Sequence, residues 1–211
     1  MKRTVAIVGV VLGLMTCGAQ AAVLYNNGAA ASNSSRCAED SGACSGTWTV
    51  FDDFTLSSAA TITDIKWTTY LYGGLSDYNG ARAWVYSADP VFGNGTLLAT
   101  VVTQVGSPAR SSLGGNFYEI DLSGLSISLN AGTYWLGIQH DTTASYATVA
   151  CTTACRSGNS TQWQNSGAGM RNYDAVSYAF SLESNQISTP ATLALLGFGL
   201  IGIGAVNRKQ A

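Results

Sequence analysis

A single histidine is the only imidazole that this chain offers for acid–base chemistry. His140 is followed by Asp141 at the end of a predicted strand, and a Ser-His-Asp or Cys-His arrangement would have to use it. The segment Gly42-Ala43-Cys44-Ser45-Gly46 has the spacing of a nucleophile elbow with cysteine as the nucleophile. Such an elbow needs a strand before it and a helix after it, whereas a polar loop and a predicted strand flank this one. The pattern therefore does not predict a nucleophilic enzyme.

Paired carboxylates offer a second chemistry, glycoside hydrolysis. The available pairs are Asp52 with Asp53 and Glu119 with Asp121. Glu119 and Asp121 lie two residues apart on a strand whose other face is apolar, which is typical of a half-solvated strand. Asp52 and Asp53 point to opposite faces, so one of them is expected to be buried or to cap backbone groups. We expect no catalytic residue among the four, and the sequence indicates no enzyme.

Metal ligands are the third possibility. The segment "SDYNG" at residues 76–80 could supply oxygen ligands to calcium, but it lacks the run of carboxylates of a dedicated site. The turn-forming pair Asn79-Gly80 explains the same residues as the tight turn of a β-hairpin. A zinc site built from cysteines lacks a Cys-x-x-Cys knuckle. We therefore expect no metal and no other cofactor.

Aromatic side chains are the remaining candidates for binding chemistry. Arg82, Trp84 and Tyr86 share one face of a predicted strand, and Trp135 lies on another strand, on the face opposite Tyr134. Aromatic platforms flanked by polar groups hold sugar rings, because the apolar ring face stacks while the rim forms hydrogen bonds. Trp84, Tyr86 and Trp135 are the candidate sugar-binding residues. The alternative is that these rings belong to the core.

The elements that must position these side chains are strands. From Thr47 onward apolar residues alternate with polar ones, and turn residues interrupt them about every eight to twelve positions, as in a sandwich or barrel. About nine strands are predicted, among them "WTVFDDFTL", "TITDIKWTTYLY", "NFYEIDL" and "GTYWLGIQH". Residues 22–187 show no helical periodicity beyond a turn or two. Sheets must then cover sheets, so we expect an all-β fold, a two-sheet antiparallel β-sandwich of jelly-roll-like form.

Charge and cysteine content both favour an exported domain. Between residues 22 and 187, 12 acidic residues stand against six basic ones. The net charge of −6 argues against nucleic acid as a partner, because phosphate binding needs a clustered basic surface. Cys37, Cys44, Cys151 and Cys155 are an even set, as expected for disulfides in an oxidising compartment. Local pairing, 37 with 44 and 151 with 155, is our preference, and crossed pairing is the alternative.

The beginning of the chain has the features of a secretory signal. Lys2 and Arg3 precede an apolar stretch, and Ala19-Gln20-Ala21 supplies the small-x-small pattern that signal peptidase accepts. We predict a signal peptide at residues 1–21 that is cut after Ala21. A lipoprotein cut at Cys17 is the alternative, but Cys17 lacks a small residue before it.

The end of the chain has the features of a weak membrane anchor. Residues 191–206 are a run of 16 uncharged residues, about 24 Å long as a helix against about 30 Å of hydrocarbon. We predict a marginal transmembrane helix over 191–206, within a tail at 188–211. Arg208 and Lys209 follow the run, so the positive-inside rule places the extreme C-terminus in the cytoplasm and the β-sandwich domain, residues 22–187, outside.

The order of these features resembles the PEP-CTERM sorting tail. "TPATLALLGFGLIGIGAVNRKQ" has a short proline motif, an apolar glycine-rich segment and a basic end. Pro190 matches the second proline of the motif, while Ser188 and Thr189 stand where the first proline and the glutamate would be. The segments "VLYNNG", "DDFTLSSAATITDIKW" and "LNAGTYWLGIQ" resemble a recurrent domain of the same proteins with no assigned role.

This resemblance implies an address more than an activity. Such tails are recognised and removed by a membrane exosortase in exopolysaccharide-forming Gram-negative bacteria. We therefore expect an exported, non-enzymatic protein, processed by signal peptidase and an exosortase-like protease. It is held briefly at the inner membrane and then belongs to the cell surface or the biofilm matrix. The alternative is a carbohydrate-binding module on the cell surface, and a secreted hydrolase is the third hypothesis.

Overall fold

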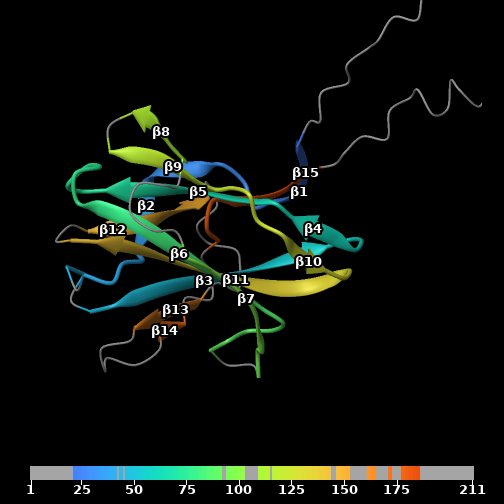
Figure 1. Ribbon diagram of the computed structural model, residues 1–211. Coiled ribbons are helices and arrows are strands. Elements are labelled where there is room, and N and C mark those ends of the chain that lie inside the picture. Colours follow the sequence, from blue (N-terminus) through green and yellow to red (C-terminus); the bar gives the residue numbers. More distant parts are fainter. Residues whose placement is uncertain are drawn as a thin grey trace, which may run out of the picture. The chain divides into compact units, whose positions relative to one another are not determined.

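Strands make up the regular secondary structure of this protein in the computed structural model (Figure 1). The structure describes residues 21–41, 43–44, 46–91, 94–102, 109–114, 116–143, 146–152, 161–164, 171–172 and 177–185. Within these ranges there is no helix, and the paired strands run antiparallel throughout. The expected all-β antiparallel fold is confirmed.

The larger sheet has seven strands, and β5 (Asp64–Leu71) lies at its centre. One side of β5 pairs with β9. The other side pairs with β15 along its first half and with β12 along its second half. The other strands of this sheet are β1 (Ala21–Asn26), β2 (Ala30–Cys37), β8 (Ala109–Gly114), β9 (Phe117–Leu122), β12 (Ala147–Thr152) and β15 (Phe180–Asn185).

The second sheet has six strands in the order β14-β13-β3-β11-β6-β7. Its bounds are β3 (Trp48–Leu56), β6 (Tyr78–Tyr86), β7 (Leu97–Val102), β11 (Gly132–Thr142), β13 (Thr161–Gln164) and β14 (Arg171–Asn172). A separate small ladder joins β4 (Ala60–Ile62) to β10 (Ile127–Leu129). The long strand β11 is the centre of this sheet, because it pairs with both β3 and β6.

The inner faces of the two large sheets enclose one apolar core. In β5 every second residue is buried, which is the period of a strand with one face on a core. The same cluster contains Phe54 from β3 and Leu136 from β11, so both sheets contribute to it. The fold is therefore β-sandwich-like. Its largest fully buried apolar side chains are Trp67, Tyr178, Phe54, Ile62, Ile65, Leu71, Ile120, Leu122, Leu136 and Leu182.

The predicted hairpin at Asn79-Gly80 is wrong. Both residues lie inside β6, and the turn precedes them at residues 72–77, where Gly74 has φ +71°. β5 and β6 belong to different sheets, so this connection crosses the sandwich. The cause is the length of β11, which extends the ladder far enough for Gly80 to pair with Asp141. The Asn79 side chain then donates to the Asp141 carboxylate at 3.3 Å.

The first and last strands of the described unit lie side by side. Residues Ala21–Asn185 form one compact unit, in which Ala21 pairs with Asn185 at the start of the β1–β15 ladder. No helix in the described ranges is long and apolar enough to cross a membrane. The predicted signal residue Ala19, the tail residues Pro190, Arg208 and Lys209, and the predicted helix 191–206 lie outside the described residues.

Candidate functional site

The outer face of the six-stranded sheet gathers aromatic rings from neighbouring strands. The register places Phe51 of β3 opposite Gly137 of β11, and Gly137 opposite Trp84 of β6. Arg82 and Tyr86 lie two residues to either side of Trp84, so they share its face. The predicted common face of Arg82, Trp84 and Tyr86 is therefore present, and β3 adds Phe51 to it.

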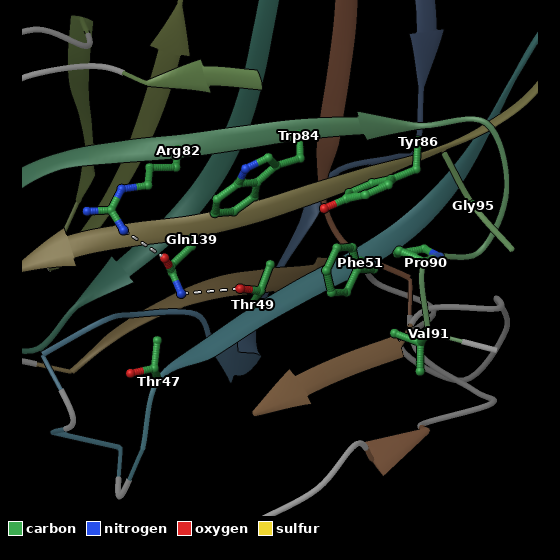
Figure 2. Close-up of a pocket in the computed structure, with 10 residues that line it drawn as sticks. All are labelled: Thr47, Thr49, Phe51, Arg82, Trp84, Tyr86, Pro90, Val91, Gly95 and Gln139. Carbon is green, nitrogen blue, oxygen red and sulfur yellow. Dashed lines mark hydrogen bonds between the residues drawn. The ribbon is translucent and has the colours of Figure 1, made fainter. Parts of the chain in front are cut away.

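These side chains line a cavity of about 400 Å³, within the range of small-molecule sites. We call it the Trp84 cavity. Figure 2 shows Arg82, Trp84 and Tyr86 in a row along β6, with Gln139 and Thr49 near the Arg82 end and Pro90 and Val91 near the Tyr86 end. Its lining residues are Thr47, Thr49, Phe51, Arg82, Trp84, Tyr86, Pro90, Val91, Gly95 and Gln139.

Gly137 makes room for the rings that form the floor of the cavity. A Cβ at this position would lie 2.7 Å from Cε1 of Phe51 and 3.4 Å from Cε3 of Trp84. Because Gly137 has no side chain, the two rings can lie against the backbone of β11 between them. Phe51 also makes an edge contact with Tyr86, at a centroid distance of 5.9 Å. The three rings are therefore held by one another and by the sheet.

The loop between β6 and β7 covers one end of the cavity. Its base is closed by Ser87, which donates from its amide to the Thr96 carbonyl at 2.9 Å and accepts from the Thr96 amide through Oγ at 3.0 Å. A Cβ on Gly95 would lie 2.3 Å from the Ala88 carbonyl oxygen, so only glycine fits this close approach. The loop thereby places Pro90 and Val91 on the cavity wall.

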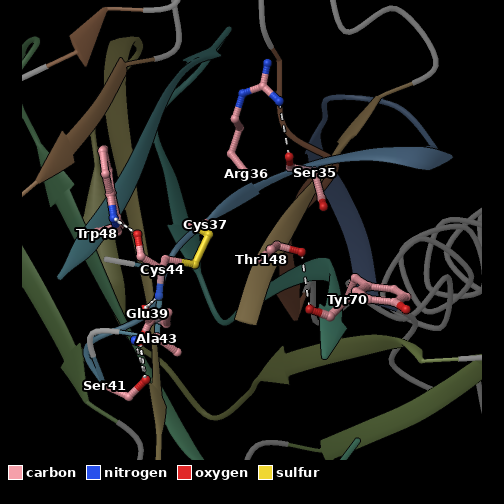
Figure 3. Close-up of a disulfide and its surroundings, with 10 residues drawn as sticks. All are labelled: Ser35, Arg36, Cys37, Glu39, Ser41, Ala43, Cys44, Trp48, Tyr70 and Thr148. Carbon is pink, nitrogen blue, oxygen red and sulfur yellow. Dashed lines mark hydrogen bonds between the residues drawn. A yellow bond between two sulfur atoms is a disulfide. The ribbon is translucent and has the colours of Figure 1, made fainter. Parts of the chain in front are cut away.

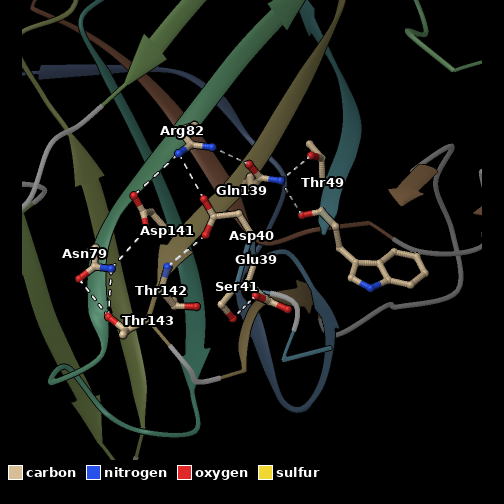
Figure 4. A network of polar contacts seen from close by, with 11 residues as sticks. Glu39, Asp40, Ser41, Thr49, Asn79, Arg82, Gln139, Asp141, Thr142 and Thr143 are labelled. Carbon is tan, nitrogen blue, oxygen red and sulfur yellow. Dashed lines mark hydrogen bonds and ion pairs between the residues drawn. The ribbon is translucent and has the colours of Figure 1, made fainter. Parts of the chain in front are cut away.

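The other end of the cavity is polar and internally bonded (Figure 4). Arg82 donates through Nη1 to Gln139 Oε1 at 3.2 Å, while its Nη2 lies 3.2 Å from Asp40 Oδ2 and 3.8 Å from Asp141 Oδ2. Gln139 Nε2 donates in turn to Thr49 Oγ1 at 3.2 Å. Burial and the neighbouring Asp141 raise the pKa of Asp40. This network fixes the guanidinium at the Arg82 end of the cavity, which we call its mouth.

Trp135, the third predicted sugar-binding residue, lies on the same outer face beside Tyr86 but is not part of this lining. It pairs with Tyr86 and Asp53 across β11, but its side chain is only 8 % exposed and does not line the Trp84 cavity. The structure thus brings Trp84 and Tyr86 together without Trp135. Phe51 and Gln139 line the cavity as well, although neither was a predicted binding residue. The alternation along a strand predicts which face of the sheet a side chain lies on, but it does not predict which residues of other strands lie beside it.

His140 is a core residue. It is fully buried between Trp67 and Tyr78, at centroid distances of 5.8 and 5.7 Å. Thr69 donates its hydroxyl to the Thr148 carbonyl, so its Oγ1 accepts from His140 Nε2 at 3.1 Å. Burial lowers the pKa of His140 to about 3. The imidazole is neutral at neutral pH and out of reach of a substrate.

Asp141 does not act as a partner to that imidazole. Its carboxylate lies near Asn79 and Arg82, on the opposite face of β11. The calcium alternative for residues 76–80 places Asn79 near this carboxylate, yet Arg82 already contributes the positive charge there. In the part of the chain that the structure describes, no group of three or more His, Cys, Asp or Glu side chains could hold a metal ion.

Asp52 is the buried member of its pair, as the alternation predicted. It is 3 % exposed and accepts from the Tyr178 amide at 2.7 Å and from Asn27 Nδ2 at 2.8 Å. Burial raises the pKa of Asp52 to about 7, against the effect of these donors. Asp52 therefore joins β3 to two other segments and does not face a cavity with a second acid.

Glu119 and Asp121 lie on the outer face of the seven-stranded sheet. They pair with Thr68 and Lys66 of β5, while Ile120 between them is fully buried. Burial raises the pKa of Asp121, and the Lys66 charge opposes that rise. The half-solvated strand expected from the sequence accounts for both carboxylates.

Cys37 and Cys44 form a disulfide with Cα atoms 6.2 Å apart (Figure 3). This confirms the local pairing for the first two cysteines and excludes Cys44 as a free nucleophile. Within the loop, the buried Glu39 accepts from the Cys44 amide at 2.8 Å. Cys151 is buried in β12, and its predicted partner Cys155 lies outside the described residues.

The chain matches no protein-family model and no curated protein sequence. The Trp84 cavity therefore has to be interpreted from its own chemistry.

Proposed function

We propose that this chain is an exported, non-catalytic protein of the cell surface or extracellular matrix, whose two-sheet, jelly-roll-like sandwich binds polysaccharide. The observation that carries the proposal is the Trp84 cavity. It combines three aromatic rings with a hydrogen-bonding rim on a sheet face that a fold of this kind does not need for its own core. Carbohydrate binding is thereby favoured over a purely structural role.

The groups that line the cavity suit a sugar. The apolar faces of Trp84 and Tyr86, which are partly exposed, offer stacking surfaces for the C–H faces of a pyranose ring, while the buried Phe51 forms the floor beneath them. Among the described residues neither the Trp84 indole N–H nor the Tyr86 hydroxyl has a hydrogen-bond partner, so both are open to sugar hydroxyls. A tyrosine hydroxyl is protonated and able to donate at neutral pH, and burial raises the pKa of Tyr86 further.

The proposed address rests on the two ends of the chain and on the disulfide. The signal at residues 1–21 and the PEP-CTERM-like tail at 188–211 support export through signal peptidase and an exosortase-like membrane protease. A disulfide between Cys37 and Cys44 supports an oxidising compartment. In this proposal the protein is anchored transiently in the inner membrane of a Gram-negative bacterium and then joins its exopolysaccharide.

No catalytic activity belongs to this proposal, and the secreted hydrolase is not favoured. The lone histidine is fully buried and its Nε2 lies against Thr69, and the buried carboxylate Asp52 accepts from the Tyr178 amide. We expect wild-type protein to hydrolyse none of the glycans that it binds.

A fluorescence titration tests the binding proposal. The protein secreted by its host is titrated with oligosaccharides of common matrix polysaccharides. We expect at least one to change the tryptophan emission, and Trp84→Ala to weaken its binding about tenfold or more, as for other buried aromatic anchors. Tyr72→Ala, at a ring that is 61 % exposed and outside the cavity lining, is the matched control and should leave binding unchanged.

Two results would contradict the binding proposal. One is the absence of any response across the panel, and the other is a loss of binding in Tyr72→Ala that spares Trp84→Ala. The address has its own test: the intact mass of the protein recovered from the medium should lack residues 1–21 and the tail from 188. A secreted protein that retains both ends would refute the processing route.

A further inference from the structure

The mouth of the Trp84 cavity contains one positive and two negative groups. Arg82 is the one charged residue among the ten that line the cavity. Its Nη2 is 3.2 Å from Asp40 and 3.8 Å from Asp141. The formal charge of the three side chains together is therefore −1. Of the three, only Arg82 lines the cavity, and the two aspartates lie next to it.

One side of the guanidinium is also engaged in a hydrogen bond within the protein. Arg82 Nη1 donates to Gln139 Oε1, and the amide of Gln139 points its Nε2 away toward the Trp48 carbonyl and Thr49 Oγ1, at 3.3 and 3.2 Å. A bidentate guanidinium–carboxylate pair with a ligand would have to break these contacts. An acidic ligand would thus have to compete with Gln139, Asp40 and Asp141 for Arg82.

The two carboxylates are held in place from separate elements. Asp141 belongs to β11, and its Oδ1 accepts from Asn79 at 3.3 Å. Asp40 belongs to the disulfide-closed segment, which lies along β11 through hydrogen bonds from the Asp40 amide to the His140 carbonyl and from the His140 amide to the Ala38 carbonyl, at 3.1 and 2.7 Å. Asp40 Oδ1 accepts from the Thr142 amide at 3.3 Å. Both negative charges therefore have fixed positions at the mouth.

We propose that the Trp84 cavity takes uncharged sugar units and rejects acidic ones, such as uronates, because Asp40 and Asp141 more than neutralise Arg82. This selectivity deepens the proposed function and rests on it. A carboxylate on the ligand meets a group of net negative charge, in which Arg82, the one cation among the described lining residues, is already paired with Asp40 and Asp141, whereas a hydroxymethyl group at the same carbon carries no charge to be repelled.

The test compares oligosaccharides that differ only in oxidation at C6. We use glucose and glucuronate, mannose and mannuronate, and galactose and galacturonate hexamers of matched linkage, titrated into the full secreted protein at about 20 mM and about 300 mM NaCl. We expect the neutral member of the bound pair to bind at least about fivefold more tightly at low salt, as like charges near a protein surface repel. The difference should shrink at high salt, where the Debye length falls below about 6 Å.

Charge-neutralising variants locate the effect. Asp141→Asn, at a side chain that is 40 % exposed, and Asp40→Asn should each raise uronate affinity relative to neutral affinity, so that the ratio of the two dissociation constants moves toward one. Glu183→Gln removes a carboxylate on the other sheet and should change neither affinity. Thermal unfolding of each variant verifies its fold; if Asp40→Asn does not fold, Asp141→Asn and the salt dependence decide alone.

The outcomes separate the inference from the function on which it rests. If no hexamer of either class binds, the proposed function fails. If a uronate binds as tightly as its neutral partner or more tightly at low salt, the selectivity is refuted while glycan binding stands. If uronates are rejected equally in wild type and in both Asn variants, Asp40 and Asp141 are not the cause and the inference is overturned.

Discussion

The two large sheets of this protein differ in what covers their outer faces. On the seven-stranded sheet, β5 alternates between buried and partly exposed residues along its whole length, as expected where one face of an antiparallel sheet meets water. On the six-stranded sheet, β11 is buried on both faces from Trp135 to His140. Continuous burial in a central antiparallel strand indicates that a second layer covers its outer face.

That second layer consists of the side chains that line the Trp84 cavity. Phe51 and Trp84 lie over Gly137, and the β6–β7 loop adds Pro90 and Val91. The outer face of the seven-stranded sheet instead carries an ion pair between Lys66 and Glu183, 2.7 Å apart. The comparison teaches that the outer faces differ in chemistry: the recess on the six-stranded sheet is lined by the rings of Phe51, Trp84 and Tyr86, whereas the one on the seven-stranded sheet is lined in part by Lys66, Thr68 and Glu119.

Replacing one tryptophan from each sheet should give the largest contrast. Trp67 is 1 % exposed in the core, so Trp67→Ala is expected to cost about 3–5 kcal/mol of unfolding free energy. Trp84→Ala removes a ring from an open recess and should cost about 1 kcal/mol, while it weakens glycan binding. Urea unfolding of both variants measures this difference. Equal losses of stability would show that Trp84 is a core residue after all.

Removing the disulfide separates loop closure from cavity charge. The bridge spans a sequence separation of seven, so Cys37→Ser with Cys44→Ser should cost about 2.5 kcal/mol by the chain-entropy relation. Because the same loop holds Asp40 near Arg82, the discrimination between neutral and acidic hexamers should also fall. Wild-type protein treated with a reductant is the control and should show the same two changes. Unchanged stability would contradict a structural role for the bridge.

Filling the floor of the cavity should affect the six-stranded sheet alone. Gly137→Ala places a Cβ 2.7 Å from Phe51, and such overpacking costs about 1–3 kcal/mol. Glycan binding should weaken as the rings of Phe51 and Trp84 are displaced. Thr68→Ala, on the outer face of the other sheet, should remain within about 0.5 kcal/mol of wild type and bind normally. Thermal unfolding and titration check both variants, and tight binding by Gly137→Ala would refute the described floor.

The pH dependence of stability should reveal two opposed buried groups. His140 has a folded pKa of about 3, below its ordinary 6.5, so its contribution is present above pH 6.5 and is lost as the pH falls toward 3. Asp52 has a folded pKa of about 7, above its ordinary 3.8, so its contribution is present below pH 3.8 and is lost as the pH rises toward 7. Between about pH 4 and 6.5 the two slopes, each up to about 1.4 kcal/mol per pH unit, largely cancel.

Single variants uncover these slopes. Relative to wild type, Asp52→Asn should lose stability as the pH falls from about 6.5 to 4, because only the His140 contribution remains. His140→Gln should gain stability over the same interval, because only the Asp52 contribution remains. Urea midpoints at half-unit pH steps measure both differences. Parallel curves for wild type and Asp52→Asn would contradict the buried, protonated state of Asp52 at pH 5.

The strands that the sequence predicted are those that alternate. The sequences of β5 and β9 alternate between apolar and polar residues, and the structure has strands there. The polar segment Ala30–Cys37 has no such pattern, yet it is β2, which forms because β12 offers backbone partners for it. The hairpin at Asn79-Gly80 failed for a similar reason, since a long-range ladder with β11 outweighed local turn preference.

From the sequence, only those neighbours in the site that belong to the same strand could be predicted. The spacing of Arg82, Trp84 and Tyr86 gave their common face. The contribution of Phe51 and Gln139 depends on the register of β3, β11 and β6, which are far apart in sequence. Asp40 reaches Arg82 because the disulfide-closed segment lies along β11, and no local pattern specifies that arrangement.

The most direct test of the central claim is to observe the Trp84 indole while a glycan binds. In a ¹⁵N-labelled protein, the indole N–H signal assigned by its loss in Trp84→Phe should shift during titration with a neutral hexamer, and that of Trp67 should stay fixed. A hexamer that binds without moving the Trp84 signal, or that moves only signals of the seven-stranded sheet, would contradict the account.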